Sequence, residues 1–234
     1  MINSVCSSPK NKFLVEVKCS NLAHYHNPIL IIPMKKICVK LSGWGALLVC
    51  VPVMYQIHKG DIFNPASYFL WSALSLICSL VLIRAKEGGH TMMLGYFFSD
   101  FSVGLYASLR SGKAIFGKFE WFVIALTILC IIIYVWCELR GDTKQSDQDP
   151  KAKKVFKPAV IVNGVACMIA GLPQIADSFR DPHSIRFVIC GLYVVISCLA
   201  YYGEENFNGK FIPGLSLFYW FALVWGILVA RTIV

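Results

Sequence analysis

Seven long apolar stretches run through this chain, separated by short polar segments. A helix that crosses the hydrocarbon core of a bilayer needs roughly 20 mostly apolar residues, within a range of about 17–25. The stretches have this length, and they lack the alternation of apolar and polar residues that marks the strands of a membrane β-barrel. We therefore expect an all-α, multi-pass membrane protein whose seven transmembrane helices cover approximately residues 41–57, 66–83, 91–109, 121–138, 158–178, 183–202 and 211–231.

The composition argues against a separate soluble domain. Hydrophobic residues make up 57% of the chain and charged residues 15%, whereas soluble domains have about 45–50% apolar and about 25% charged residues. The longest polar segment, residues 141–157, is expected to be a charged loop because it is too short to enclose a core. The lipid bilayer is the expected surrounding of most of the chain.

The first 40 residues are expected to form an N-terminal arm without a transmembrane helix. Their apolar run Ile29–Ile32 has only four residues and is followed by Pro33, so it does not fit a secretory signal. Two interpretations stay open: the arm is amphipathic or disordered, or translation begins at Met34. No function is assigned to residues 1–33.

Two related phrases indicate an internal repeat. Residues 51–68 read VPVMYQIHKGDIFNPASY, and residues 170–185 read AGLPQIADSFRDPHSI. Each phrase has a Gln-Ile pair at a helix end, a short polar loop, and an Asn-Pro or Asp-Pro that opens the next apolar stretch. Gln56 and Gln174 are 118 residues apart. In membrane proteins, a repeat of this kind is a pointer to a transport pathway between the halves.

The repeat predicts a 3+1+3 arrangement of helices. Residues 41–110 would form the first triple-helix repeat, and residues 158–234 would form the second, with a linker helix in 111–140. A unit of three helices would place the next unit upside down in the bilayer. The single linker helix restores the direction, so we expect the two triplets to run parallel.

Pro173-Gln174, at the end of an apolar helix in such a chain, resembles the PQ-loop motif of the SWEET-like superfamily of membrane transporters. The resemblance implies two triple-helix repeats that move small solutes by alternating access. The first half departs from the motif, because Tyr55-Gln56 stands in place of Pro-Gln and the proline is displaced to Pro52.

Prolines near these motifs are candidates for hinges. A proline inside a helix removes one backbone hydrogen bond and clashes with the preceding turn, so Pro52 and Pro173 mark places where helices can bend. Gln56 and Gln174 are expected either to bond a freed carbonyl across the bundle or to lie in the headgroup region.

A second pair of prolines opens the apolar stretches that follow these motifs. Pro65 follows Asn64, and Pro182 follows Asp181. By the resemblance both would serve as hinges, but the residues also fit first-turn prolines placed after N-caps.

Asp100 is the acid expected near the middle of the third helix. An ionised carboxylate there costs roughly 2.5–3.5 kcal/mol on insertion scales, so such a group normally faces a polar cavity or a partner. We expect Asp100 to lie in a transport cavity, as a substrate ligand or a proton-coupling site, with Ser99 and Tyr106 as hydrogen-bonding neighbours. The alternative is that the helix is shifted and Asp100 reaches an interface.

Aromatic and polar residues inside other stretches extend this candidate pathway. Rings can sandwich a small solute while polar groups fix its orientation, although Trp and Tyr are also common anchors at membrane interfaces. The further candidates for the cavity are Trp71, Asn163, Tyr193 and Trp220. The tryptophans interpreted as interface anchors are Trp44, Trp121 and Trp136.

No pattern in the chain indicates a metal site, a cofactor or an enzyme. The ten cysteines contain no C-x-x-C pair, and a buried cysteine usually acts as a small apolar side chain. The glycine-rich phosphate loop and the common hydrolase and zinc motifs are also missing. Nucleic acid is an unexpected partner despite the net charge of +9, because the basic residues are spread over short loops.

The distribution of Lys and Arg predicts the orientation, since these residues are retained on the cytoplasmic side. Fifteen of the 22 would lie on the side of the N-terminus and seven on the other. The count favours a cytoplasmic N-terminus, whereas members of the resembled superfamily generally have it outside.

Together these features predict a carrier of a small polar solute whose class stays open, with a proton coupled at Asp100 as one possibility. The rival hypotheses are a receptor or regulatory protein on the same fold, and a structural subunit whose partner chain would satisfy Asp100. Homo-oligomerisation is left open.

Overall fold

Helices account for almost all of the chain that the computed structural model describes, namely residues 28–60, 63–85, 89–111, 116–140, 150–172, 186–205 and 207–233. They are α1 (Pro28–Leu48), α2 (Cys50–Lys59), α3 (Pro65–Arg84), α4 (His90–Ser111), α5 (Lys118–Arg140), α6 (Pro150–Ala170), α8 (Arg186–Gly203) and α9 (Phe207–Ile233). No strand occurs within these ranges, so the predicted all-α class is confirmed. The chain divides into two units, residues 1–34 and 35–234, and the second forms a helix bundle.

Four helical segments of the described chain are long and apolar enough to cross a membrane. They are Met34–Lys59, Pro65–Arg84, Lys118–Arg140 and Gly209–Val229. Lys157–Ala170 and Val188–Gly203 are apolar but shorter. The helix α4 has 22 residues, but it is not among the four, because polar side chains such as Asp100 dilute its apolar character. Membrane-spanning character is therefore supported for four of the seven predicted stretches.

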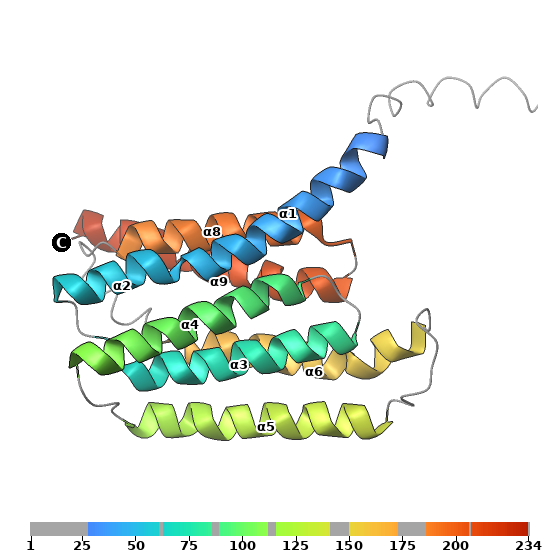
Figure 1. The fold of residues 1–234 in the computed structure, drawn as a ribbon, viewed down its shortest axis with the longest axis horizontal. Helices are drawn as coiled ribbons and strands as arrows, with labels where there is room; N and C mark the ends of the chain where they lie inside the picture. The colour runs from blue at the N-terminus through green and yellow to red at the C-terminus, as the bar shows by residue number, and fades with distance from the viewer. Residues whose placement is uncertain are drawn as a thin grey trace, which may run out of the picture. The chain divides into compact units, whose positions relative to one another are not determined.

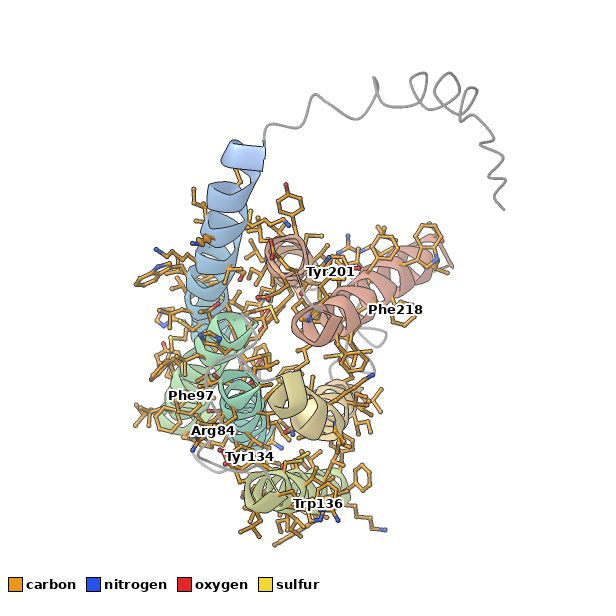
Figure 2. The ribbon with its side chains drawn as sticks, turned by 90° about the vertical axis from the view of Figure 1, so that its right-hand side faces the viewer. Arg84, Phe97, Tyr134, Trp136, Tyr201 and Phe218 are labelled. Atoms are coloured by element: carbon orange, nitrogen blue, oxygen red, sulfur yellow. The ribbon has the colours of Figure 1, made fainter. Side chains whose placement is uncertain are left out.

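The outside of the bundle is apolar. Trp121 is 62% exposed and Phe218 is 73% exposed, and Trp136 and Phe218 lie on the outside of their helices in Figure 2. All three tryptophans interpreted as interface anchors are exposed. Water-soluble monomers rarely expose contiguous apolar patches larger than a few hundred Å². The outer surface is therefore suited to hydrocarbon.

Two helices begin earlier in the chain than predicted. The first predicted stretch, 41–57, is part of a longer helical run from Pro28 to Lys59 that is interrupted at Val49. Pro150 begins α6, so the second part of the predicted loop 141–157 is helical and Pro158 lies inside the helix. The cause in α6 is the Lys- and Ala-rich sequence before Pro158, which favours a helix without being apolar.

The start of α3 shows why Pro65 is tolerated there. The side chain of Asn64 accepts a hydrogen bond from the backbone N–H of Ala66 at 3.2 Å, and Pro65 occupies the first turn. A first-turn proline loses no helical hydrogen bond, so the first-turn interpretation is confirmed for Pro65. The equivalent Pro182 lies outside the described residues.

The helices pack in two groups that have the same pattern of contacts. In residues 35–111, α4 contacts both α2 and α3; in residues 150–233, α9 contacts both α6 and α8. The groups meet where α3 contacts α6 and where α1 approaches α8, with Gly45 against Ile196 and Gly203 against Val39. The helix α5 packs on α3 and α6, and Figure 1 shows it along the lower edge of the bundle.

Candidate binding site

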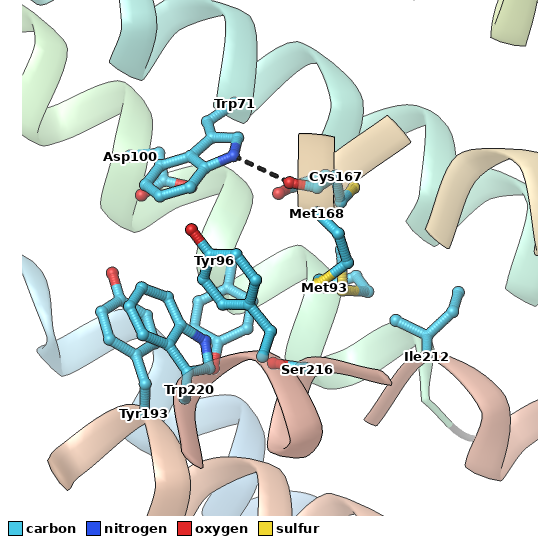
Figure 3. A pocket seen from close by; sticks show the side chains of 12 residues that line it. Trp71, Met93, Tyr96, Asp100, Cys167, Met168, Tyr193, Ile212, Ser216 and Trp220 are labelled. Atoms are coloured by element: carbon cyan, nitrogen blue, oxygen red, sulfur yellow. Dashed lines mark hydrogen bonds between the residues drawn. The ribbon is translucent and has the colours of Figure 1, made fainter. Parts of the chain in front are cut away.

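A cavity of about 50 Å³ lies inside the bundle, with walls from α3, α4, α6, α8 and α9. Figure 3 shows its lining side chains converging from these helices. Since a water molecule needs roughly 10–15 Å³ of such volume, the cavity has room for a few waters. A typical ligand pocket has about 300–1,000 Å³, so a solute of ordinary size enters only if helices separate.

The structure brings four of the seven predicted pathway residues together in this cavity. Trp71 comes from α3, Asp100 from α4, Tyr193 from α8 and Trp220 from α9. These residues are as far apart in the sequence as 149 positions. Their convergence is the main result that the fold adds to the sequence.

Aromatic rings form most of the wall. Trp220 stacks on Tyr193 with centroids 4.1 Å apart, and it meets Trp71 in a T-shaped contact at 6.5 Å. Tyr193 in turn contacts Tyr96 at 5.4 Å. Offset-stacked and edge-to-face pairs of this kind are worth about 0.5–1.5 kcal/mol each beyond the area they bury. The rings therefore form a connected set that joins the helices on both sides of the cavity.

Asp100 is the acidic group of the cavity. Its side chain is only 5% exposed, and within the described residues it makes no hydrogen bond or ion pair. No described Lys, Arg or His lines the cavity. A buried carboxyl group without a partner is costly, so this position requires a bound proton, a cation or water.

Hydrogen bonds hold the surrounding wall in place. The indole N–H of Trp71 donates to the carbonyl of Cys167 at 3.2 Å, and this bond is the dashed line of Figure 3. The hydroxyl of Tyr219 donates to the carbonyl of Gly171. Gly171 has no room for a side chain, because a Cβ atom would lie 2.9 Å from the Trp71 ring. These contacts tie α6 to α3 and to α9.

Hydroxyl groups add a small polar strip to the wall. Ser75 and Ser216 both line the cavity, and the hydroxyl of Ser216 is 2.9 Å from that of Ser197. The Ser197–Ser216 bond joins α8 to α9.

Three predicted pathway residues do not line the cavity. Ser99 is buried beside Asp100 with an unbonded hydroxyl, but its side chain points from another face of α4. Asn163 is buried and donates to the carbonyl of Ala159 at 2.9 Å, whereas its side-chain oxygen has no partner. Tyr106 lies two turns from Asp100, where its hydroxyl is 3.4 Å from His58.

The structure describes the hinge and motif residues predicted in the first half of the chain, but not those predicted in the second half. Pro52 lies three residues after the helix interruption at Val49. Gln56 is 1% exposed and neither its amide nitrogen nor its oxygen has a hydrogen-bond partner, so the predicted bond across the bundle is not formed. Pro173 and Gln174 lie outside the described residues.

Several lining residues were missed by the sequence analysis, although a helical spacing links them to predicted ones. Met93 and Tyr96 precede Asp100 by seven and four positions, and Ser216 precedes Trp220 by four. Such spacings place side chains on one face of a helix. Extending the faces of Asp100 and Trp220 along their helices would have found these three residues.

Comparison with known proteins adds no relative: no family model, no curated protein and no solved structure matches this chain. Among the described residues, no group of three or more His, Cys, Asp or Glu side chains is placed to hold a metal ion.

Proposed function

We propose that this chain carries a small solute across a membrane by alternating access between two triple-helix repeats, residues 41–110 and 158–234. The observation that carries the proposal is the position of Asp100, which lies unpaired in a cavity lined by helices of both predicted repeats. An intramembrane acid is expensive and is retained where a solute or proton uses it.

The packing pattern supports the predicted repeat. In each group the last helix contacts the two helices before it. The helix α4 contacts α2, which continues the first helical run, and α3, and the helix α9 contacts α6 and α8. The contacts between the groups are also related, because α3 meets α6 and α1 meets α8. This exchange of equivalent helices is expected for duplicated units, and it supports the resemblance to SWEET-like, PQ-loop transporters.

The small cavity volume supports a conformational cycle. A space of about 50 Å³ fits a few waters but no metabolite, so binding requires the two groups of helices to part on one side. A bundle whose central cavity is this small is consistent with a state of such a cycle in which the cavity is contracted. In this proposal Asp100 binds the solute directly or takes up the coupled proton.

Orientation is part of the proposal. The excess of Lys and Arg on the side of the N-terminus supports a cytoplasmic N-terminus. Labelling of single added cysteines by a membrane-impermeant reagent in intact cells tests this orientation; the chain's own cysteines would first be replaced.

Uptake by reconstituted vesicles tests the transport function. The full chain in liposomes is offered radiolabelled sugars, amino acids, amines and nucleosides, and we expect time-dependent accumulation of one class. Asp100→Asn is expected to abolish uptake while the protein still elutes as a single folded species. Ser108→Ala is the matched control on α4, because that hydroxyl only bonds the carbonyl of Gly104. Saturable binding without accumulation would instead support the receptor hypothesis. The proposal is contradicted if the chain shows no binding and no uptake of any of these solutes.

A further inference from the structure

The unpaired charge of Asp100 limits what can occupy the cavity. Described basic side chains have partners elsewhere: Lys35 pairs with Glu205, Arg84 pairs with Glu138, and Arg110 lies 3.4 Å from His58. Three others lie over rings on the outside, and they are Lys59, Arg140 and Lys210. None of these lines the cavity. Within the part of the chain that the structure describes, no basic side chain neutralises an ionised Asp100, so a cationic occupant would supply that charge.

The aromatic wall selects among cations. The face of an aromatic ring carries a negative potential, and Trp is the strongest of these rings in attracting a cation. Trp71 and Trp220 line the cavity with their planes at 60°, and Tyr96 and Tyr193 continue the wall. Such walls suit a cation whose charge is covered by carbon, because burial of alkyl groups adds to the attraction.

Two methionines complete the apolar lining. Met93 from α4 and Met168 from α6 line the cavity, and the unbranched thioether of methionine adapts to groups of different shape. Their side chains are suited to contacts with N-methyl groups and do not compete for hydrogen bonds.

Other solute classes fit the described lining less well. A sugar presents many hydroxyl groups, whereas most of the described wall is aromatic ring and methionine. Two of its hydroxyls are already bonded, Ser216 to Ser197 and Tyr219 to the carbonyl of Gly171. An amino acid would bring a carboxylate, for which the described lining holds no basic side chain, into the same space as Asp100. Both would leave polar groups unpaired at a large cost.

We propose that the cavity between α3, α4, α6, α8 and α9 binds a small organic cation of the quaternary or tertiary ammonium class that lacks a carboxylate. Asp100 is its counter-ion, and Trp71, Tyr193 and Trp220 hold its alkyl groups. The inference rests on the proposed transport function, since it names the class of solute that is carried.

A pair of probes that differ only in charge tests the class. Choline and 3,3-dimethylbutan-1-ol have nearly the same shape, but the quaternary nitrogen of choline is replaced by carbon in the alcohol. We expect choline to bind the full chain in detergent at least about tenfold more tightly than the alcohol. Glycine betaine, which adds a carboxylate to the same head group, is expected to bind more weakly than choline. Quenching of tryptophan fluorescence and competition with radiolabelled choline measure the affinities.

Asp100→Asn separates a counter-ion from a structural residue. The substitution keeps the shape of the side chain and removes the charge, so it is expected to weaken choline binding at least about tenfold while binding of the neutral alcohol is unchanged or tighter. A structural defect would weaken both probes together. Trp220→Leu is a second variant, expected to weaken choline more than Trp220→Phe does.

The results also separate this inference from the proposed transport function. Choline binding without uptake into vesicles upholds the cation site and contradicts the carrier. Uptake of a neutral or anionic solute that choline does not inhibit upholds the carrier and overturns the cation site. The inference is also overturned if the alcohol binds the wild-type chain as tightly as choline, if choline does not bind, or if Asp100→Asn leaves choline binding unchanged.

Discussion

The indole ring of Trp220 lies flat against the phenol ring of Tyr193, with centroids 4.1 Å apart and planes 5° from parallel. The same indole meets Trp71 edge-on at 6.5 Å. Because Tyr193 lies on α8, Trp220 on α9 and Trp71 on α3, one side chain connects both predicted repeats at the cavity. If the two predicted repeats move against each other, the contact with Trp71 has to break or rearrange, whereas the stack with Tyr193 can move as a unit.

Replacing Trp220 tests whether this contact serves the site. We expect Trp220→Leu to lower the free energy of unfolding by about 1–3 kcal/mol, since it removes three aromatic pairs and leaves a space beside Tyr193. Trp220→Phe keeps one ring and is expected to lose about half as much. Thermal unfolding in detergent measures the loss of stability, and initial uptake rates measure whether the contact serves the site.

Phe218→Leu is the matched control on α9, because Phe218 is 73% exposed and contributes to the outer surface. Both its stability and its uptake should remain close to those of the unchanged chain. If Phe218→Leu proves as harmful as Trp220→Leu, the ring contacts at the cavity have no special role.

Close packing of α1 on α4 is the basis of a second prediction. A Cβ atom on Gly95 would clash with the carbonyl of Gly43 and lie 2.8 Å from the side chain of Ala46. We expect Gly95→Ala to destabilise the bundle by about 1–3 kcal/mol through overpacking, because small residues let membrane helices approach closely. Denaturant-dependent unfolding of the purified chain measures the loss.

Gly191 provides the comparison. A Cβ atom there would meet nothing within 4 Å, so Gly191→Ala should be neutral or stabilising by up to about 1 kcal/mol through its helix propensity. Equal losses at Gly95 and Gly191 would mean that the α1–α4 contact is not tight.

The sequence was most informative about the site at residues whose side-chain chemistry is costly inside an apolar helix. An acid inside an apolar stretch is costly wherever the helix packs, so Asp100 could be placed at a cavity before the fold was known. Trp71, Tyr193 and Trp220, which the sequence marked as candidates for the cavity, line it as well.

What the sequence could not provide is the rotation of each helix. Tyr106 and Asn163 have the same chemistry as true lining residues, but their helix faces point elsewhere, and only packing decides that direction. The start of α6 was also misplaced, because a Lys-rich segment can be helical outside the hydrocarbon core. Ser99 was predicted to lie in the cavity with Asp100 but does not line it, since adjacent residues on a helix project about 100° apart.

Glu120 is expected to anchor the predicted linker helix. Its carboxylate accepts hydrogen bonds from the side-chain amide of Asn64 at 2.9 Å, from the hydroxyl of Ser67 at 3.2 Å and from the backbone N–H of Gly117 at 2.9 Å. A hydrogen bond to a charged group is worth about 1.5–3 kcal/mol, so Glu120→Ala should cost about 2–4 kcal/mol of stability. The measurement is the midpoint of thermal unfolding in detergent.

The ion pair of Lys35 with Glu205 supplies the control. Glu205 is 67% exposed and makes one contact at 3.1 Å, and exposed ion pairs are worth about 0–1 kcal/mol. Glu205→Ala should therefore shift the midpoint much less than Glu120→Ala. An unchanged midpoint in Glu120→Ala would show that the junction of α3 and α5 is held by other contacts.

Pro52 is expected to set the flexibility of the first helix. The helix is interrupted at Val49, while the bonds from Val49 N–H to Gly45 and from Val53 N–H to Val49 are kept at 3.2 and 3.5 Å. Since proline has no N–H to donate to the carbonyl of Leu48, Pro52→Ala should restore that bond and stabilise the helix at the interruption. We expect slower amide exchange at residues 50–54 and, if the interruption is a hinge of the transport cycle, a lower uptake rate.

Pro65→Ala is the control, because Pro65 occupies a first turn where no helical bond is missing. It should leave amide exchange in residues 50–54 unchanged. Faster exchange in Pro52→Ala would show that the proline stiffens this helix, and unchanged uptake despite slower exchange would remove the hinge from the mechanism.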